Sequence, residues 1–327
     1  MKMFGRRQFA RIRGKKPRVV AVGSFDGVHL AHRRLILLAR ERAKAIDGEL
    51  VVLTFWPLPG IALGRRGSPR ILTSPAKRAE ILADLEVDSL VTMHFDDDLA
   101  GMEPGSFVRE VLVNELGVDE ICVGFNFTFG REGSGDATTL KKFGEELGFA
   151  VHVLAPVQVR GHRVSSTNIR RLIAGGRVDE AAVLLGRPYA MEGKVVRGQG
   201  RGRCLGFPTA NVWTRADLIP PAAGVYAVKA VSEDLDLDAP GVANVGGSPT
   251  FHEESGPEGF LEVHIPGFRG ELYGRRLSVE FSRWIRPARD FRDLDELKRQ
   301  IARDVENALY EAPERASQSL RYPSALC

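Results

Sequence analysis

The chain has 327 residues, of which 43% are hydrophobic and 27% charged, and its 46 Lys and Arg residues outnumber its 42 Asp and Glu residues. This is the composition of an ordinary soluble globular protein. No apolar run reaches the roughly 20 residues that a membrane-spanning helix needs, and a length above about 300 residues favours two domains over one hydrophobic core.

The positive charge is concentrated at the N-terminus. Residues 1–18 are basic, with no apolar stretch behind them, so we expect no signal peptide and a cytoplasmic protein. A net charge of +4 and a pI near 9.0 are compatible with a nucleic-acid partner or with anionic small molecules. The three cysteines, Cys122, Cys204 and Cys327, are too scattered for a disulfide framework or a zinc cluster, and we expect reduced, non-catalytic thiols.

From Arg18 to about Leu154, short apolar runs alternate with amphipathic segments, which predicts strands and crossover helices of a parallel sheet. Ser74 and Ser106 are expected to cap two of the helices at their N-termini, and Gly117 is expected to end the second. The predicted strands are 18–22, 49–55, 89–95, 120–124 and 150–154. The pattern indicates a Rossmann-like, doubly wound α/β domain.

The predicted secondary structure changes after residue 186. Residues 166–186 contain two short helical patterns that we assign to the end of the first domain. Beyond them, alternating apolar residues separated by Gly and Pro predict a β-barrel or sandwich, followed by a helix at 294–309 and a loosely held tail at 311–327. We therefore predict two domains, 1–186 and 187–327.

The first candidate site follows the first predicted strand, where residues 22–32 read VGSFDGVHLAH. Gly23 and Gly27 bracket a tight turn, and His29 and His32 lie at a helix start on the carboxyl side of the sheet. A helix N-terminus offers unpaired N–H groups to a phosphate, and two imidazoles can donate to its oxygens. A solvated surface pair and a zinc site remain alternatives.

The second candidate site is a glycine-rich basic loop followed by Gly206-Phe207-Pro208-Thr209-Ala210-Asn211. Glycines let backbone N–H groups approach a phosphate closely, and Arg201 and Arg203 can neutralise its charge. Taken alone, such a loop is as often a flexible surface or an RNA contact.

A later strand pattern, FLEVHI, covers residues 260–265. Its alternation puts Leu261, Val263 and Ile265 on one face and Glu262 and His264 on the other. On the pattern alone, Glu262 could simply be an exposed strand residue paired with an arginine.

These motifs together resemble the bacterial bifunctional riboflavin kinase/FAD synthetases. The segments GSFDGVHLAH, VGFNFTFGREGSGD and RVSSTNIRR resemble the nucleotidylyltransferase module of that family, in its order. The segments GQGRGRCLGFPTAN, GVYAV, GVANVGGSPTF and LEVHI resemble its riboflavin kinase domain. The resemblance covers the chain from about Val19 to Val305.

For the first domain, the resemblance implies adenylylation of FMN by ATP, giving FAD and pyrophosphate, with His29 and His32 as catalytic residues. It also implies a set of ATP-binding residues and a flavin-lining segment that includes Asn126. The ATP-binding residues are Gly23, Phe25, Gly27, Ser165, Ser166, Thr167 and Arg170.

For the second domain, the resemblance implies phosphorylation of riboflavin by ATP, with Glu262 as the catalytic carboxylate. Thr209 and Asn211 would help to hold Mg²⁺ and the ATP phosphates, and Arg201, Arg203 and Gly206 would complete the ATP site. The implied partners are riboflavin, FMN and ATP; neither a nucleic acid nor a membrane is expected, and self-association is left open.

Two positions depart from the family pattern. Ala31 stands where a Gly usually separates the histidines, and Leu58 stands where the family commonly has a His between two prolines. A riboflavin kinase with a weakened or lost adenylyltransferase site is therefore one alternative. A nucleic-acid-binding protein on a nucleotidyltransferase scaffold is another, from a different functional class.

Overall fold

The structure, a computed structural model, describes residues 1–9, 16–64, 70–198, 200–246 and 260–310. It divides into two compact units, Met1–Ser165 and Ser166–Cys327, which are taken separately below. Within the described ranges, no helix combines the length and the apolar character needed to cross a membrane.

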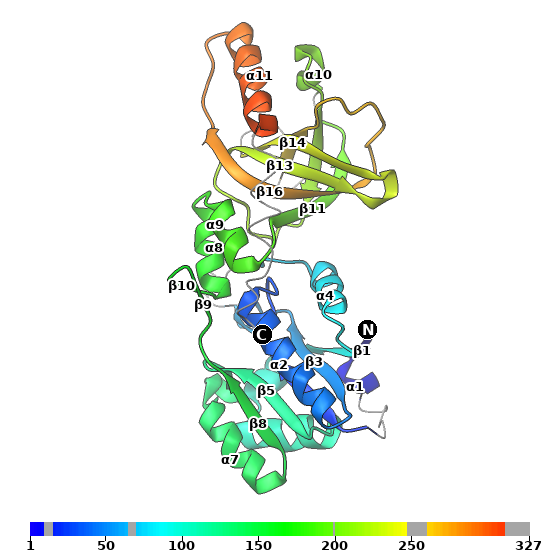
Figure 1. The fold of residues 1–327 in the computed structure, drawn as a ribbon, viewed down its shortest axis with the longest axis vertical. Coiled ribbons are helices and arrows are strands. Elements are labelled where there is room, and N and C mark those ends of the chain that lie inside the picture. Colours follow the sequence, from blue (N-terminus) through cyan, green and yellow to red (C-terminus); the bar gives the residue numbers. More distant parts are fainter. Residues whose placement is uncertain (10–15, 65–69, 199, 247–259, 311–327) are drawn as a thin grey trace. The chain divides into compact units, whose positions relative to one another are not determined.

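The first unit is built on a six-stranded parallel sheet with the strand order β1-β4-β3-β2-β5-β8 (Figure 1). The strands are β1 (Lys2–Gly5), β2 (Arg18–Val22), β3 (Glu49–Trp56), β4 (Ser89–His94), β5 (Glu120–Gly124) and β8 (Ala150–Leu154). Every residue of β2 is buried, as expected for a central strand covered on both faces. The five predicted strands are confirmed, and β1 adds an edge strand that the sequence did not reveal.

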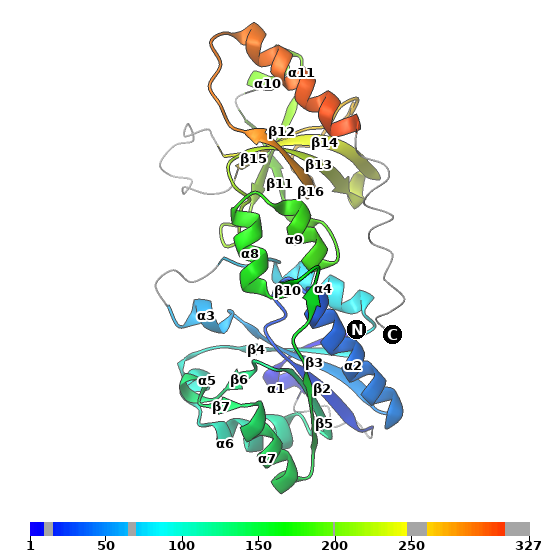
Figure 2. The same ribbon diagram turned by 60° about the vertical axis from the view of Figure 1, so that its left-hand side comes forward.

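Helices cover both faces of this sheet (Figure 2). One face packs Val19, Ala21 and Val52 against α2 (Leu30–Ala45) and α4 (Pro75–Asp84). The other face packs against η1 (Phe107–Glu115), a π-helical segment, and α7 (Ala137–Leu147). The doubly wound prediction is thereby confirmed. The shorter elements are α1 (Arg6–Phe9), α3 (Pro59–Ala62), α5 (Asp97–Gly101), α6 (Pro104–Ser106), β6 (Thr128–Phe129), η2 (Arg131–Gly133), β7 (Gly135–Asp136), β9 (Gln158–Val159) and β10 (His162–Arg163).

The two predicted N-terminal helix caps have different outcomes. Ser74 caps α4 as expected, because its hydroxyl accepts the amide hydrogen of Lys77 at 3.1 Å. The prediction for Ser106 is wrong: its backbone is already helical and its side chain makes no capping bond. Pro104 starts the helix one turn earlier, since proline is well suited to a first turn.

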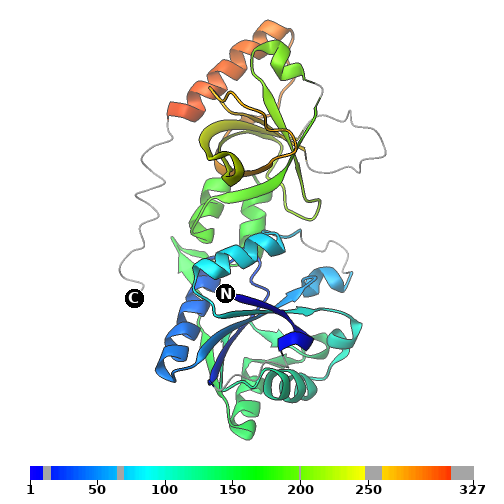
Figure 3. The same cartoon turned by 90° about the vertical axis from the view of Figure 1, so that its right-hand side faces the viewer.

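The second unit contains a closed six-stranded barrel, which decides between the two predicted β architectures (Figure 3). Neighbours in the order β11-β12-β15-β14-β13-β16 pair antiparallel. The strands are β11 (Tyr189–Val196), β12 (Thr209–Thr214), β13 (Gly224–Ser232), β14 (Leu237–Val245), β15 (Phe260–His264) and β16 (Arg276–Pro287). The remaining elements are α8 (Ser166–Ala174), α9 (Val178–Leu185), α10 (Arg201–Leu205), η3 (Glu233–Leu235) and α11 (Leu294–Tyr310). Helix α11 packs Ala308 against Val225, Ala227 and Val242 of the barrel.

Helices α8 and α9 pack with the barrel. The amide of Ala222 donates to the carbonyl oxygen of Ile173 at 3.3 Å. The backbone at Gly176 lies so close to Trp284 that a Cβ atom there would be 2.7 Å from the indole ring. The compact unit therefore begins at Ser166, whereas the division at residues 186 and 187 stays a prediction about functional domains.

Candidate active sites

The first site lies at the switch point of the parallel sheet. Strand β2 has β3 on one side and β5 on the other, so the connections that follow β2 and β5 leave the sheet in opposite directions. In open α/β sheets, ligands bind outside the carboxyl ends of the strands at such a point. The loop with His29 follows β2 and the segment with Asn126 follows β5, so the fold brings both predicted groups to this edge.

The two histidines lie in the first turn of α2. His29 is the N-cap residue, 4% exposed, and its Nδ1 accepts the amide hydrogen of His32 at 3.3 Å. The two imidazole rings stack with centroids 3.6 Å apart and planes inclined by 10°. The helix begins at Leu30, which places both rings beside the N–H groups of its first turn.

The loop before α2 is held by a buried carboxylate. Asp26, 1% exposed, accepts the amide hydrogen of Leu72 at 3.0 Å and that of Thr73 at 3.3 Å. The amide of Gly27 donates in turn to Thr73 Oγ1 at 3.1 Å. Gly27 has a φ of 84°, which a glycine tolerates without strain. These bonds fix the turn that leads into His29.

The side chain of Phe25 is part of the core at this loop. It is fully buried, and its ring lies 5.2 Å from the ring of His32. Any contact between Phe25 and ATP would therefore involve its backbone, and its predicted binding role stays a prediction. The backbone N–H of Gly23 donates a hydrogen bond to the carbonyl oxygen of Leu53, which continues the sheet beyond β2.

A buried arginine stands beside the same loop. Arg78 is 2% exposed, and its Nη2 lies 3.8 Å from Asp26 Oδ1. Burial lowers the pKa of Arg78, and the charge of Asp26 opposes that shift. Within the described residues, its Nε and Nη2 atoms have no hydrogen-bond partner. The pair joins α4 to the histidine loop.

The remaining residues predicted for the first reaction are placed as follows. Asn126 is exposed in a turn closed by a bond from the amide of Phe127 to the carbonyl of Gly124 at 3.0 Å. Ser165 ends the first unit, whereas Ser166, Thr167 and Arg170 lie on α8 in the second. Their ATP contacts stay predictions.

The second site lies on the outer face of the barrel. Residues directly opposite one another in an antiparallel pair share a face. Glu262 on β15 is opposite Asn211 on β12 and opposite Asn244 on β14. His264 is opposite Thr209 two positions further along. Leu261, Val263 and Ile265 are buried, so the predicted alternation of this strand is confirmed.

The backbone of the glycine loop closely approaches the predicted metal-binding side chains. A Cβ atom at Gly198 would lie 2.1 Å from Asn211 Nδ2. A Cβ atom at Gly202 would lie 2.4 Å from the carbonyl oxygen of Phe207 and 3.0 Å from Thr209 Oγ1. Only glycine allows this approach, so the loop forms a tight backbone cradle around Thr209 and Asn211.

The other residues predicted for this loop are partly described. Gly206 ends α10 with a left-handed φ of 88°, and Arg203 is exposed. Arg201 begins α10, and its side chain lies outside the described part of the chain.

The donor set of the barrel site suits a hard cation. Thr209, Asn211 and Glu262 offer oxygen atoms from one face, and oxygen is the ligand that Mg²⁺ prefers. Among the described residues there is no group of three or more His, Cys, Asp or Glu side chains that could hold a metal alone. The residues thus fit an ion that keeps waters and phosphates as its other ligands. The zinc alternative for the histidine pair has no support in the described residues.

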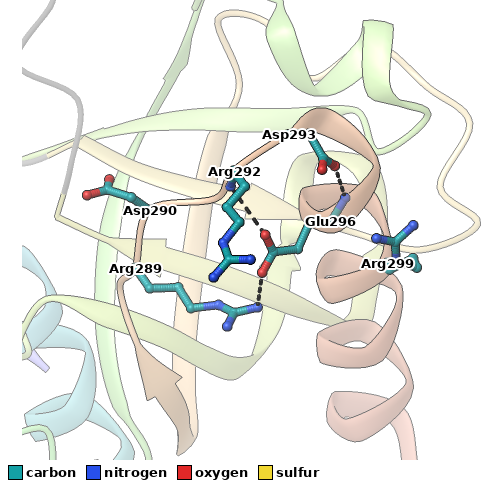
Figure 4. A pocket seen from close by; sticks show the side chains of 6 residues that line it. All are labelled: Arg289, Asp290, Arg292, Asp293, Glu296 and Arg299. Atoms are coloured by element: carbon teal, nitrogen blue, oxygen red, sulfur yellow. Dashed lines mark hydrogen bonds and ion pairs between the residues drawn. The ribbon is translucent and has the colours of Figure 1, made fainter.

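A charged cavity of about 570 Å³ lies at the start of α11 (Figure 4). It is lined by Arg289, Asp290, Arg292, Asp293, Glu296 and Arg299. Arg289 pairs with Glu296 at 3.3 Å and donates to Gln300 at 3.0 Å, and Asp293 accepts the amide hydrogen of Glu296. None of the predicted site residues lines this cavity.

Comparison with known proteins assigns both units. Residues 12–168 match the family described as FAD synthetase, and residues 185–310 match the family described as riboflavin kinase. A bifunctional riboflavin kinase/FMN adenylyltransferase from Bacillus subtilis is 35% identical over 89% of this chain and 91% of its own length. The enzyme of the same name from Escherichia coli K12 is 37% identical over 88% of this chain and 90% of its own length. This chain belongs to the bifunctional riboflavin kinase/FMN adenylyltransferase family.

The architecture of this family member is shared with a solved structure. A crystal structure described as a macrolide-efflux protein from Streptococcus pneumoniae superposes with a TM-score of 0.82 and 30% sequence identity. The match covers 93% of this chain and 97% of that one. Both the α/β unit and the barrel unit are therefore found in one known chain, in the same order.

Three polar residues that lie at these candidate sites were not predicted from the sequence. Asp26 lies inside the histidine motif VGSFDGVHLAH, and its position between Gly23 and Gly27 could have identified it from the sequence. Asn244 lies in the quoted segment GVANVGGSPTF, but only the strand register shows that it faces Glu262. Arg78 carries no local signal, because its role depends on burial against a loop 52 residues away in the sequence.

Proposed function

We propose that the chain makes FAD from riboflavin in two ATP-dependent steps at two separate sites. The barrel site converts riboflavin and ATP to FMN and ADP, and the switch-point site joins FMN to AMP, releasing pyrophosphate. The two family matches and the full-length relatives support this proposal. Because both steps consume ATP, we assign them to the cytoplasm.

In the kinase step, Glu262 accepts the proton of the riboflavin 5′-hydroxyl as that oxygen attacks the γ-phosphorus of ATP. The glycine cradle orients the phosphates, while Thr209 and Asn211 are the side chains that would hold Mg²⁺. When bound, the ion neutralises charge on the transferring phosphoryl group.

In the adenylyltransferase step, the phosphate of FMN attacks the α-phosphorus of ATP, so no protein nucleophile is needed. The N–H groups of the first turn of α2 and the two imidazoles stabilise the charge that develops there. Asp26 holds the loop that presents His29. Catalysis then consists of positioning and charge stabilisation.

One structural observation carries this proposal: the predicted catalytic groups of the two steps lie on different units. The histidine pair lies at the sheet switch point, and Glu262 lies opposite Asn211 on the barrel. Ala31 lies within the first turn of α2, between the two stacked histidines.

The test is a product assay on the purified full chain. With riboflavin, ATP and Mg²⁺, chromatography should show FMN first and FAD later. With FMN as the only flavin, FAD should form directly. FMN formation without any FAD from supplied FMN would favour the riboflavin kinase alternative, and salt-sensitive RNA binding without ATP turnover would favour the nucleic-acid-binding alternative.

A further inference from the structure

We propose that His264 is a positioning residue of the kinase site, which fixes the peptide that leads into Thr209. The inference rests on the proposed kinase function and adds a residue to it. His264 is half-buried on β15, two positions after Glu262 and on the same face.

The imidazole of His264 makes one defined polar contact. Its Nδ1 lies 2.8 Å from the carbonyl oxygen of Pro208. A carbonyl oxygen can only accept, so Nδ1 carries the proton and donates. The ring also meets the ring of Phe207 edge to face, with centroids 5.5 Å apart and planes at 81°. His264 therefore contacts Phe207 and Pro208, the two residues that precede β12.

The peptide unit between Pro208 and Thr209 determines where the Thr209 hydroxyl lies. A peptide unit is planar, so a fixed Pro208 carbonyl also fixes the N–H and Cα atoms of Thr209. Pro208 has no N–H of its own with which to anchor the turn. The amide of Phe207 donates to the carbonyl oxygen of Gly202 at 2.9 Å, which ties the other side of this turn to the glycine loop.

There is little free space around the hydroxyl group of Thr209. A Cβ atom on Gly202 would already lie 3.0 Å from Thr209 Oγ1, so the hydroxyl is confined between the glycine loop and β15. A turn that rotated away from His264 would carry this hydroxyl into the loop or out of line with Asn211.

His264 lies on the same strand as Glu262 and also contacts the turn before Thr209. Glu262 and His264 project from the same face of β15, and the register places Thr209 opposite His264 and Asn211 opposite Glu262. The histidine thus ties the strand that carries the base to the turn that meets the nucleotide. A misplacement of about 1 Å between such groups is enough to lower the rate strongly.

Two substitutions separate the hydrogen bond from the ring contact. His264→Asn keeps a nitrogen donor close to the position of Nδ1 but removes the ring. His264→Phe keeps a ring against Phe207 but removes the donor. Both are made in the full chain, and kcat and KM are measured for ATP and for riboflavin at saturating Mg²⁺, together with adenylylation of supplied FMN.

The expected result is a loss that follows the donor. His264→Phe lowers kcat/KM for ATP about 3- to 10-fold, the range of one lost hydrogen bond, and leaves KM for riboflavin within about 2-fold. His264→Asn stays within about 2-fold of the parent chain on every constant. Adenylylation of FMN is unchanged in both variants.

A spectroscopic readout covers the case in which a variant folds poorly. In the parent chain with ¹⁵N-labelled histidine and no substrate, NMR should show the His264 proton on Nδ1. A proton found on Nε2 alone would overturn the proposal, and so would equal losses in the Asn and Phe variants or an unchanged kcat/KM for ATP in the Phe variant. If the parent chain phosphorylated no riboflavin although the Nδ1 proton was present, the kinase function itself would fail, while the contact would stand.

Discussion

The imidazole of His29 both caps helix α2 and stacks on the imidazole of His32, at a centroid separation of 3.6 Å. Because Nδ1 of His29 accepts the amide hydrogen of His32, the proton of the neutral ring lies on Nε2. Nδ1 therefore serves the helix, and Nε2 carries the ring proton. The two roles can be separated by mutation.

We predict that His29→Asn strongly lowers adenylylation while leaving the helix intact. The amide oxygen of Asn is a good N-cap acceptor, but the side chain lacks a donor at the position of Nε2. FAD formation from supplied FMN should fall by about 100-fold or more, and the thermal midpoint should shift by only about 2 °C. Riboflavin phosphorylation should be unchanged.

His162→Asn is the matched control for this variant, because His162 is an exposed histidine on β10 of the same unit. It should keep full activity in both assays. Loss of both activities in a folded His29→Asn chain would contradict the assignment of separate sites.

A second prediction concerns Glu262. Glu262→Gln keeps the shape and removes the base, so riboflavin phosphorylation should fall by roughly 10² to 10⁴, the usual range for a lost general base. Adenylylation of supplied FMN should persist. Glu280→Gln is the control, since Glu280 is a half-buried strand residue on β16, and it should keep most of the kinase activity. A Glu262→Gln chain with normal kinase rates would remove Glu262 from the mechanism.

The sequence predicted the framework well because its signals were local. Strand β2 follows directly from a run of apolar residues, and the barrel strand with Glu262 follows from its alternation. The pairings of Asp26 with α4 and of Asn244 with Glu262 could not be read in this way, because they depend on tertiary register. For a related reason, an amphipathic pattern in α8 and α9 shows that a face of each helix is buried but not what buries it.

The glycine cradle supplies a third prediction. Gly202→Ala would place a methyl group 2.4 Å from the carbonyl oxygen of Phe207, so the turn before Thr209 must move. The kinase rate should fall about tenfold or more, with a higher Mg²⁺ requirement, and adenylylation should be spared. Gly101→Ala, where the added methyl group meets no atom within 4 Å, should have no effect. Normal kinase activity of Gly202→Ala across a Mg²⁺ titration would refute the cradle.

The fourth prediction is that Cys122 is inert in the folded chain. The thiol is fully buried on β5, and burial raises its pKa to about 12, so almost no thiolate exists near neutral pH. In a Cys204→Ser, Cys327→Ser chain, the remaining thiol should react with a disulfide reagent at about pH 8 at least about 100-fold more slowly than after unfolding in guanidinium. Rapid labelling of the folded chain would show that β5 is accessible.

The last structural prediction concerns acid stability. Bonds from Arg42 at 2.8 and 2.9 Å hold the pKa of Glu120 below its usual range, burial opposes the shift, and His152 at 2.7 Å supports it. A carboxyl with a depressed pKa stabilises the fold above its unfolded value, about 4.3, and loses that contribution as the pH falls through its folded value.

Glu120→Gln should therefore lower the thermal midpoint by about 2–5 °C at pH 7, and the difference from the parent chain should shrink as the pH falls below about 4. Glu146→Gln is the control: Glu146 forms an exposed pair with Arg109 and should change the midpoint little at either pH. A Glu120 difference that stays constant down to acid pH would show that the charge of Glu120 does not stabilise the fold.

The central claim is that FMN and FAD are made at separate sites of one chain, and a complementation assay tests it most directly. With riboflavin, ATP and Mg²⁺, the His29→Asn chain alone should stop at FMN, and the Glu262→Gln chain alone should leave riboflavin unchanged. A mixture of the two chains should produce FAD, because FMN released by the first chain is adenylylated by the second. Failure of the mixture to form FAD, or loss of both activities in either folded variant, would contradict the account.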